Sequence, residues 1–426
     1  MVKNILIITS NYTGHGHKSI TEALIEQFSE YPDINIHVAD GFELGGIIGL
    51  KIGKAYGSVT RNARELYRLI WDISIKNPNI IRDFTQIIIQ DSFLKLLKKT
   101  VPDVIIAVHP SFVGSIINIL EEHNIKIPLV SIVADLVSIS PLWADPRAYC
   151  TICPTVEAMR KCIEFGVPSS KILVTGFPVR RKFCESGTGN EPDIYHSSER
   201  PLECLIMSGG EGSGNLGRLA KILLKNFDCH VKIVAGRNVL LKKRLERTLK
   251  EKSPDSIEIY GFIENVQDLM RSSDIAFTRG SPNVMMEAVH CNVPLVVTGA
   301  LPGQEEGNPE YLLKYNLGVV CKDLRKLRST VTELLANDAL KLRQIKKAQI
   351  EYRNPDAAKN IVDFILGIEN DEYGYVPGQL EKLRLSDKSN DFIFKKTNEL
   401  IFKKIRIKPE MLKAKSLSAG KQKRRQ

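Results

Sequence analysis

The stretch from Tyr260 to Asn308 constrains the fold of this 426-residue chain more than any other. It contains two short apolar runs, residues 275–278 and 295–298, which have the length expected of buried parallel strands. Between them, Asn283 is expected to cap a helix. A turn rich in Gly and Pro follows each run, and α/β sheets bind ligands at that end of their strands. An ordinary βαβ unit with polar loops is the alternative interpretation.

Polar side chains in this stretch suggest a ligand. Glu287 lies inside the expected helix, whose free N-terminus suits a phosphate. A carboxylate beside that phosphate can accept hydrogen bonds from two vicinal hydroxyls, as on a ribose. The second turn, PGQEEGN, places Gln304, Glu305 and Asn308 where they can bind further hydroxyls. Together these residues predict a nucleotide-sugar site.

The same stretch resembles the donor half of the GT-B glycosyltransferases. This family includes monogalactosyldiacylglycerol synthase, bacterial processive diacylglycerol glucosyltransferase and, more distantly, the UDP-GlcNAc transferase of peptidoglycan synthesis. Its pattern is GF-x-[DN]-N-M, a Gly/Pro-rich turn, T-x-x-E-A and PGQEEGN. This chain carries an intact PGQEEGN together with Gly261, Phe262, Asn265, Glu287 and Ala288. It departs at Val284, where the family has a Thr that would contact the diphosphate.

The first strand and turn predict the catalytic base. Residues 4–10 are expected to form a strand, followed by a turn and a helix, which is the opening unit of a doubly wound domain. The turn resembles the family's T-G-G-G-H, which places Gly14 and Gly16 beside the donor and aligns His17 with the family's His; His15 replaces a Gly. An imidazole can take the proton from an attacking hydroxyl. A His17 that only holds the turn is the alternative.

Three further residues, each in a loop, are expected at the cleft between the two domains. A strand over residues 103–108 ends in His109, and one over residues 129–133 ends before Asp135. These tips resemble the family's VHP and TDL loops, so we expect the two side chains to position the acceptor or to orient His17. Loop-holding roles are the alternative. Arg180 ends a match to the family's G-x-P-V-R and is expected to reach the donor diphosphate as a fork donor.

The donor domain is expected to begin with a strand over residues 203–208 and a glycine-rich turn. Backbone amides of such a turn can bind phosphate, although the Gly-Lys-Ser/Thr ending of a Walker A loop is missing. The resemblance adds Ile263, which lies where the family's backbone meets the uracil ring. The expected donor-binding residues of this domain are Gly209, Gly210, Gly212, Ile263, Ser281, Asn283, Val284, Glu287, Gln304, Glu305 and Asn308.

The resemblance covers roughly residues 1–366 and implies an α/β GT-B fold, with two Rossmann-like domains facing across a cleft. We predict an acceptor domain over residues 1–185, a polar linker over 186–201, a donor domain over 202–367 and a basic tail over 368–426. The expected reaction is inverting transfer of a hexose from a UDP-sugar to a lipid such as diacylglycerol. A UDP-GlcNAc transferase with a polyprenyl-linked acceptor, a UDP-sugar epimerase and a non-catalytic nucleotide-sugar-binding protein are the alternatives.

Charge and apolar patches suggest contact with a membrane surface rather than with nucleic acid. The net charge is +11, and residues 371–426 contain 15 Lys and Arg against 7 Asp and Glu. Apolar residues interleave with these lysines near residues 391–407, so the tail is expected to bind anionic lipid. A solvated extension or a helix packed on the donor domain is the alternative. Ile47, Ile48, Leu50 and Ile52 would form an exposed apolar patch unless covered, and the resemblance implies that residues 41–84 help to receive the lipid acceptor and the membrane. A packed helical hairpin is the alternative.

The remaining composition predicts the compartment and the cofactor requirement. The eight Cys show no paired framework, Cys150 and Cys153 are most simply buried thiols, and a reducing cytoplasm is expected. No run reaches the roughly 20 apolar residues of a membrane span, and we expect no signal peptide. No DxD pair occurs in the candidate donor loops, so we expect neither a metal nor another cofactor.

Overall fold

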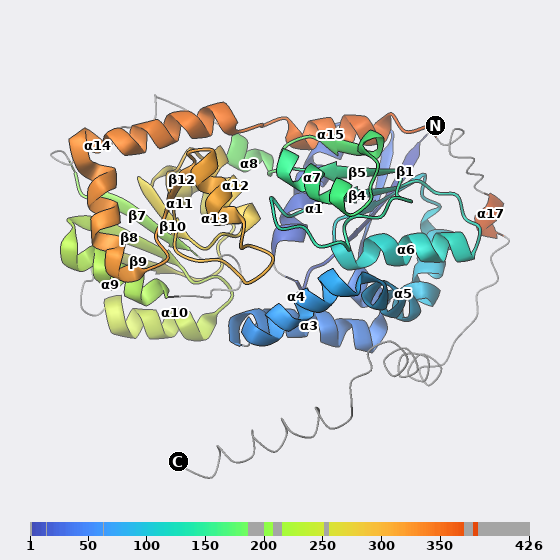
Figure 1. The fold of residues 1–426 in the computed structure, drawn as a ribbon, viewed down its shortest axis with the longest axis horizontal. Helices are drawn as coiled ribbons and strands as arrows, with labels where there is room; N and C mark the ends of the chain where they lie inside the picture. The colour runs from blue at the N-terminus through green and yellow to red at the C-terminus, as the bar shows by residue number, and fades with distance from the viewer. Residues whose placement is uncertain are drawn as a thin grey trace, which may run out of the picture.

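The computed structural model describes residues 2–13, 15–62, 64–185, 200–207, 215–250, 255–369 and 378–381. In this part of the chain the backbone forms two six-stranded parallel sheets flanked by helices, which lie side by side in Figure 1. The predicted GT-B architecture of two Rossmann-like halves is therefore confirmed. The predicted linker falls almost entirely on residues 186–199 and most of the tail on residues 382–426, which lie outside the described residues.

The first sheet has the strand order β2-β1-β3-β4-β5-β6. Its inner strands are continuous apolar runs, and Ile5 to Ile8 of β1 are fully buried, as expected of a parallel sheet that is covered on both faces. Its strands are β1 (Lys3–Thr9), β2 (Ile34–Asp40), β3 (Val104–Ala107), β4 (Leu129–Ile132), β5 (Cys150–Cys153) and β6 (Ile172–Val174). Its helices are α1 (His15–Phe28), α2 (Gly41–Leu44), α3 (Gly46–Asn62), α4 (Arg64–Lys76), α5 (Pro78–Thr100), α6 (Pro110–Glu122), α7 (Val156–Glu164) and α8 (Arg181–Cys184).

The second sheet has the strand order β12-β11-β10-β7-β8-β9, and each of these strands is parallel to its neighbours. Its strands are β7 (Leu202–Met207), β8 (Cys229–Val234), β9 (Ile257–Tyr260), β10 (Ile275–Thr278), β11 (Leu295–Val297) and β12 (Gly318–Val320). The helices that follow β7 are α9 (Leu216–Asn226), α10 (Val239–Leu245), α11 (Val266–Arg271), α12 (Pro282–His290), α13 (Asn308–Lys314), α14 (Leu327–Tyr352), α15 (Ala357–Leu366) and α17 (Gly378–Glu381). The predicted strands are present, several of them one or two residues shorter than expected.

The chain passes between the two halves twice. The first passage follows α8, and the second joins α14 to α15, which packs against α1 of the first half. Lys3 fixes the end of α15 by donating hydrogen bonds to the backbone carbonyls of Ile365, Leu366 and Ile368. Glu185, the last described residue before the first passage, and Asp356, in the second, line one surface cavity of about 350 Å³. The first passage therefore begins next to the second.

Residues 41–84 form α2, α3, α4 and the start of α5. These residues pack as helices, as the hairpin interpretation predicted. They also leave apolar side chains exposed, as the lipid-acceptor interpretation predicted. Ile47 of α3 and Leu69 of α4 are 68% and 53% exposed, and Ile52, Leu66 and Ile70 are also exposed. Among the described residues, none of the helices combines the length and the apolar character needed to cross a bilayer.

Candidate active site

A cavity of about 400 Å³ lies between the two halves, where the carboxyl ends of both sheets meet. The structure brings most of the predicted site residues into its wall. Those that line it are Gly16, His17, Asp135, Arg180, Ile263, Ser281, Asn283, Val284, Glu287, Gln304 and Glu305. His109 and Asn308 lie behind the wall, while Gly14, Gly209, Gly210 and Gly212 lie outside the described residues.

His17 is a buried residue in the first turn of α1, on the acceptor side of the cavity. Burial lowers the pKa of its imidazole to about 4, and a hydrogen bond to the backbone of Val108 raises this pKa by less. The ring is therefore neutral at pH 7. Its Nδ1 is buried and has no hydrogen-bond partner within the described part of the chain.

His109 supports His17 from behind. The two ring centroids are 4.6 Å apart, and His109 Nδ1 accepts a hydrogen bond from the backbone amide of Ser111, which caps α6. Burial, and next the neighbouring His17, lower the pKa of His109 well below its usual value. His109 thus packs against the His17 ring and is not among the residues that line the cavity, where an acceptor contact was predicted.

Asp135 follows β4 and connects the two halves through hydrogen bonds. Its Oδ2 accepts from Trp143 Nε1 at 2.8 Å, and its Oδ1 accepts from Gln304 Nε2 at 2.9 Å. Burial raises the pKa of Asp135 to about 6, and these two hydrogen bonds lower it by less. Its described hydrogen bonds do not include His17, while His109 lies against the His17 ring.

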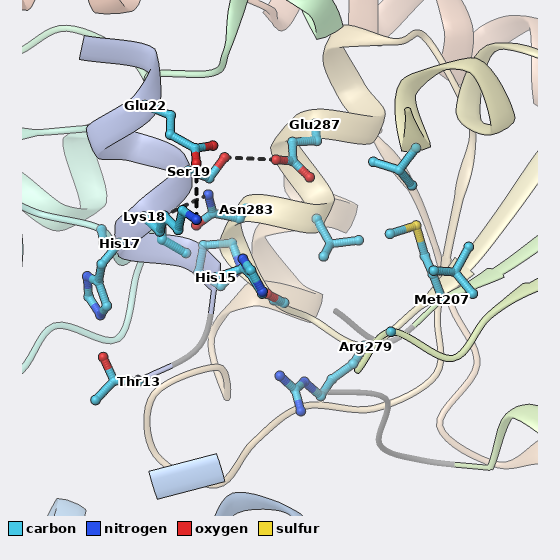
Figure 2. A pocket seen from close by; sticks show the side chains of 18 of the residues that line it. Thr13, His15, His17, Lys18, Ser19, Glu22, Met207, Arg279, Asn283 and Glu287 are labelled. Carbon is cyan, nitrogen blue, oxygen red and sulfur yellow. Dashed lines mark hydrogen bonds and ion pairs between the residues drawn. The ribbon is translucent and has the colours of Figure 1, made fainter. Parts of the chain in front are cut away.

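The start of α12 corrects one sequence prediction. Ser281, not Asn283, is the N-cap, and Pro282 occupies the first helical position, which its fixed φ angle favours. Asn283 instead lies inside the helix, and its side-chain amide donates to the carbonyl of Gly16 at 3.2 Å. A Cβ atom on Gly16 would lie 2.8 Å from Asn283 Oδ1, so a larger residue there would require the Asn283 side chain to move. Figure 2 shows the two helices facing each other at this point.

Glu287 is buried on the cavity side of α12. Its Oε1 accepts from Ser19 Oγ at 3.0 Å, as Figure 2 shows, and lies 3.2 Å from Arg180 Nη2. Burial raises the pKa of this carboxyl, and the charge of Arg180 opposes the increase. Arg180 also pairs with Glu22 at 2.9 Å. Its guanidinium thus lies at the wall of the cavity, held by two carboxylates.

The PGQEEGN turn is fixed mainly by its own side chains. Glu305 accepts from the backbone amide of Leu301 at 2.8 Å and pairs with Arg279 at 3.0 Å. Asn308 is fully buried and donates to the carbonyl of Gly280 at 2.7 Å, so it joins this turn to the one after β10. Gln304 is the side chain of this turn that reaches across to Asp135.

Sequence reasoning missed several residues of the cavity. His15 stacks on Phe262 with ring centroids 5.2 Å apart, and Arg237 lies 5.2 Å from the centroid of the same ring. Arg279 adds a further positive charge at the wall. Arg279 comes directly after β10 and Arg237 lies three positions after the end of β8, and this closeness to strand ends was the signal that could have identified them. No group of three or more His, Cys, Asp or Glu suited to a metal occurs in the described ranges.

Comparisons with known proteins agree with this geometry. Residues 17–179 match the family model of monogalactosyldiacylglycerol (MGDG) synthase, and residues 216–337 match that of glycosyl transferases group 1. The processive diacylglycerol beta-glucosyltransferases of Bacillus cereus and Bacillus anthracis are each 27% identical to this chain. The matches extend over 391 and 394 residues and cover 88% of this chain and 97% of each relative. The predicted resemblance is confirmed.

Solved structures support the same fold. MurG of Acinetobacter baumannii has a TM-score of 0.58 and 14% identity, covering 86% of this chain and 100% of that one. UDP-GlcNAc 2-epimerase of Neisseria meningitidis, bound to UDP-GlcNAc, has a TM-score of 0.53 and 16% identity, with the same coverage. At these identities the likeness establishes the fold, and the chemistry depends on the residues of the cavity.

Proposed function

We propose that this chain, which has the GT-B fold and matches glycosyltransferase families in both halves, transfers a hexose from a UDP-sugar to diacylglycerol with inversion. One observation carries the proposal. A neutral, buried imidazole from one half and carboxylate and amide side chains from the other line the same cavity, whose size suits a nucleotide sugar. The diacylglycerol glucosyltransferases similar to this chain support the choice of acceptor.

In the proposed reaction the acceptor hydroxyl oxygen attacks the anomeric carbon from the side opposite the diphosphate. A bond forms between that oxygen and the carbon, the bond from the carbon to the diphosphate breaks, and UDP leaves with the electron pair. His17 takes the hydroxyl proton. The N-terminus of α12 and Arg180 stabilise the charge that develops on the diphosphate, and the ribose hydroxyls bind Glu287. Gln304 and Glu305 bind the sugar, while Gly209, Gly210 and Gly212 keep their predicted role at the phosphates.

A donor panel with diacylglycerol tests this function. The protein is incubated with UDP-glucose, UDP-galactose or UDP-GlcNAc and dispersed diacylglycerol, and products are identified by mass spectrometry together with released UDP. We expect a hexosyl-diacylglycerol. Product only with a polyprenyl phosphate acceptor indicates the UDP-GlcNAc transferase, and an epimer without acceptor indicates the epimerase. Binding without any UDP release indicates a non-catalytic protein. Each of these three alternative results contradicts the proposal.

Titration of Asp135 predicts the acid side of the pH profile. Its carboxylate accepts a hydrogen bond from Gln304, and burial raises its pKa to about 6. Below pH 6 the carboxyl gains a proton, and this acceptor is lost, so kcat/KM should fall as the pH drops from 7 to 5. His17 titrates near pH 4 and does not contribute in this window. We expect Asp135→Asn to be less active, with a flat profile over this range. An acid limb near pH 6 that persists in Asp135→Asn contradicts the assignment.

The exposed apolar side chains of α3 and α4 are the proposed contact with the lipid surface. We expect Leu69→Asp to weaken binding to vesicles of neutral phospholipid, because the change removes apolar area and adds a charge that resists burial. Leu313→Asp is the matched control, since Leu313 on α13 is also 53% exposed. Sedimentation with vesicles measures both. Equal binding by the two variants contradicts this surface.

The basic tail is a separate proposal, because all of its Lys and Arg residues lie outside the described part of the chain. A chain ending at Glu381 retains the described contacts of Ile368 and Leu380 and removes all 15 basic residues of the tail. We expect it to lose only the salt-sensitive part of its binding to anionic vesicles. Both proposals imply peripheral association with a membrane from the cytoplasmic side.

A further inference from the structure

Tyr67, in the second half of the exposed helical segment, contacts the turn proposed to bind the sugar. It is buried on α4, and its hydroxyl donates to Gln304 Oε1 at 2.5 Å. Tyr56 of α3 lies 3.5 Å from the same oxygen, a much weaker interaction. On its other side, Gln304 donates to Asp135 at 2.9 Å. Tyr67 and Asp135 of the first half thus hold the Gln304 side chain of the second half.

These contacts fix the orientation of the Gln304 amide. An ionised carboxylate only accepts hydrogen bonds, so Asp135 requires the NH₂ group of Gln304 to face it. The amide oxygen must then face Tyr67, whose hydroxyl can donate. Without the Tyr67 hydroxyl this part-buried oxygen loses its short hydrogen bond, and the amide can turn.

Trp71 holds the backbone of the same turn. Gly303 has a φ of +80°, and a Cβ atom there would lie 2.4 Å from the Trp71 indole, so the ring packs directly on the main chain. Tyr67 and Trp71 are four residues apart and share one face of α4. Leu66, Leu69 and Ile70, on the rest of the helix, are exposed. Helix α4 therefore lies between the PGQEEGN turn and the outer surface.

We infer that Tyr67 is a positioning residue, which orients Gln304 so that its side chain distinguishes the sugar of the donor from a bare nucleotide. This inference rests on the proposed function, because it takes the PGQEEGN turn as the sugar subsite. It adds a residue from the acceptor half to donor recognition. It also gives α4 two roles, with one face toward the donor and the other toward the lipid.

Calorimetric binding of UDP and of UDP-glucose to the full chain tests this role. Tyr67→Phe removes only the hydroxyl and keeps the ring. We expect the affinity for UDP to stay unchanged and the advantage of UDP-glucose over UDP to fall by about three- to tenfold, the effect of one hydrogen bond. Tyr31→Phe is the matched control, since the Tyr31 hydroxyl donates to Asp363 far from the cavity. In a Gln304→Ala background, Tyr67→Phe should have no further effect.

The outcomes distinguish failure of the positioning role of Tyr67 from failure of the proposed function on which that role rests. If Gln304→Ala lowers the preference for UDP-glucose but Tyr67→Phe does not, the positioning role is overturned and the sugar subsite stands. If neither change alters the preference, the proposed sugar subsite fails and the inference fails with it. Equal weakening of UDP and UDP-glucose by Tyr67→Phe, with an unchanged melting temperature, shows a general effect on the cleft and also overturns the positioning role.

Discussion

Replacement of His17 by alanine is expected to lower kcat by about 10²-fold or more, the contribution of a general base. Burial lowers the pKa of His17 to about 4, so the ring has an unprotonated nitrogen at neutral pH. The same burial makes it a weak base toward an unactivated hydroxyl. Proton transfer should therefore accompany formation of the glycosidic bond, when the attacking oxygen becomes acidic. The affinity for UDP should change little, because the nucleotide residues are proposed mainly on the other half.

His17→Gln is the companion variant, since it fills more of the buried space than alanine and cannot act as the base. His37→Ala makes the same substitution away from the cavity and serves as the control. Steady-state kinetics give kcat, and calorimetry gives the affinity for UDP. If both His17 variants turn over at near the normal rate, His17 has no part in the chemistry.

The second large effect is expected for Glu287. Glu287→Ala removes a buried carboxylate that is proposed to accept from both ribose hydroxyls. Hydrogen bonds to a charged group contribute about 1.5–3 kcal/mol, so the Kd for UDP should rise by about 10- to 100-fold. Ser19→Ala removes the hydrogen bond that Ser19 makes to this carboxylate and leaves the charge, so its effect should be much smaller. Calorimetry with UDP measures both variants.

A nucleotide lacking both ribose hydroxyls isolates the proposed contact. Dideoxyuridine diphosphate should bind the unmodified chain more weakly than UDP does, and Glu287→Ala should bind the two ligands equally. Tight binding of the dideoxy ligand by the unmodified chain would place Glu287 away from the ribose. In that case its contacts with Ser19 and Arg180 give it a structural role.

Local features of the fold followed from the sequence, because the signals are local. Continuous apolar runs such as Ile5 to Ile8 are buried strands, and some polar residues in the loops after such strands, Asp135 and Arg279 among them, line the cavity. The N-cap at α12 was wrong because Pro282 takes the first helical position and moves the cap back to Ser281. The partners across the cavity could not be predicted. Tyr67 and Gln304 are 237 positions apart and meet only through the way the two halves face each other.

The two neighbouring chain passages determine how the cleft can open. Because Glu185, before the first passage, and Asp356, in the second, line one surface cavity, we expect any rotation of one half against the other to pivot close to that edge. Helices α3 and α4 lie at the bottom of the view in Figure 1, opposite α8 and α15 at the top. A small rotation at the pivot thus produces its largest displacement there. We therefore expect the contact between Tyr67 and Gln304 to break early when the halves open for donor entry or UDP release. We expect it to form last when the halves close.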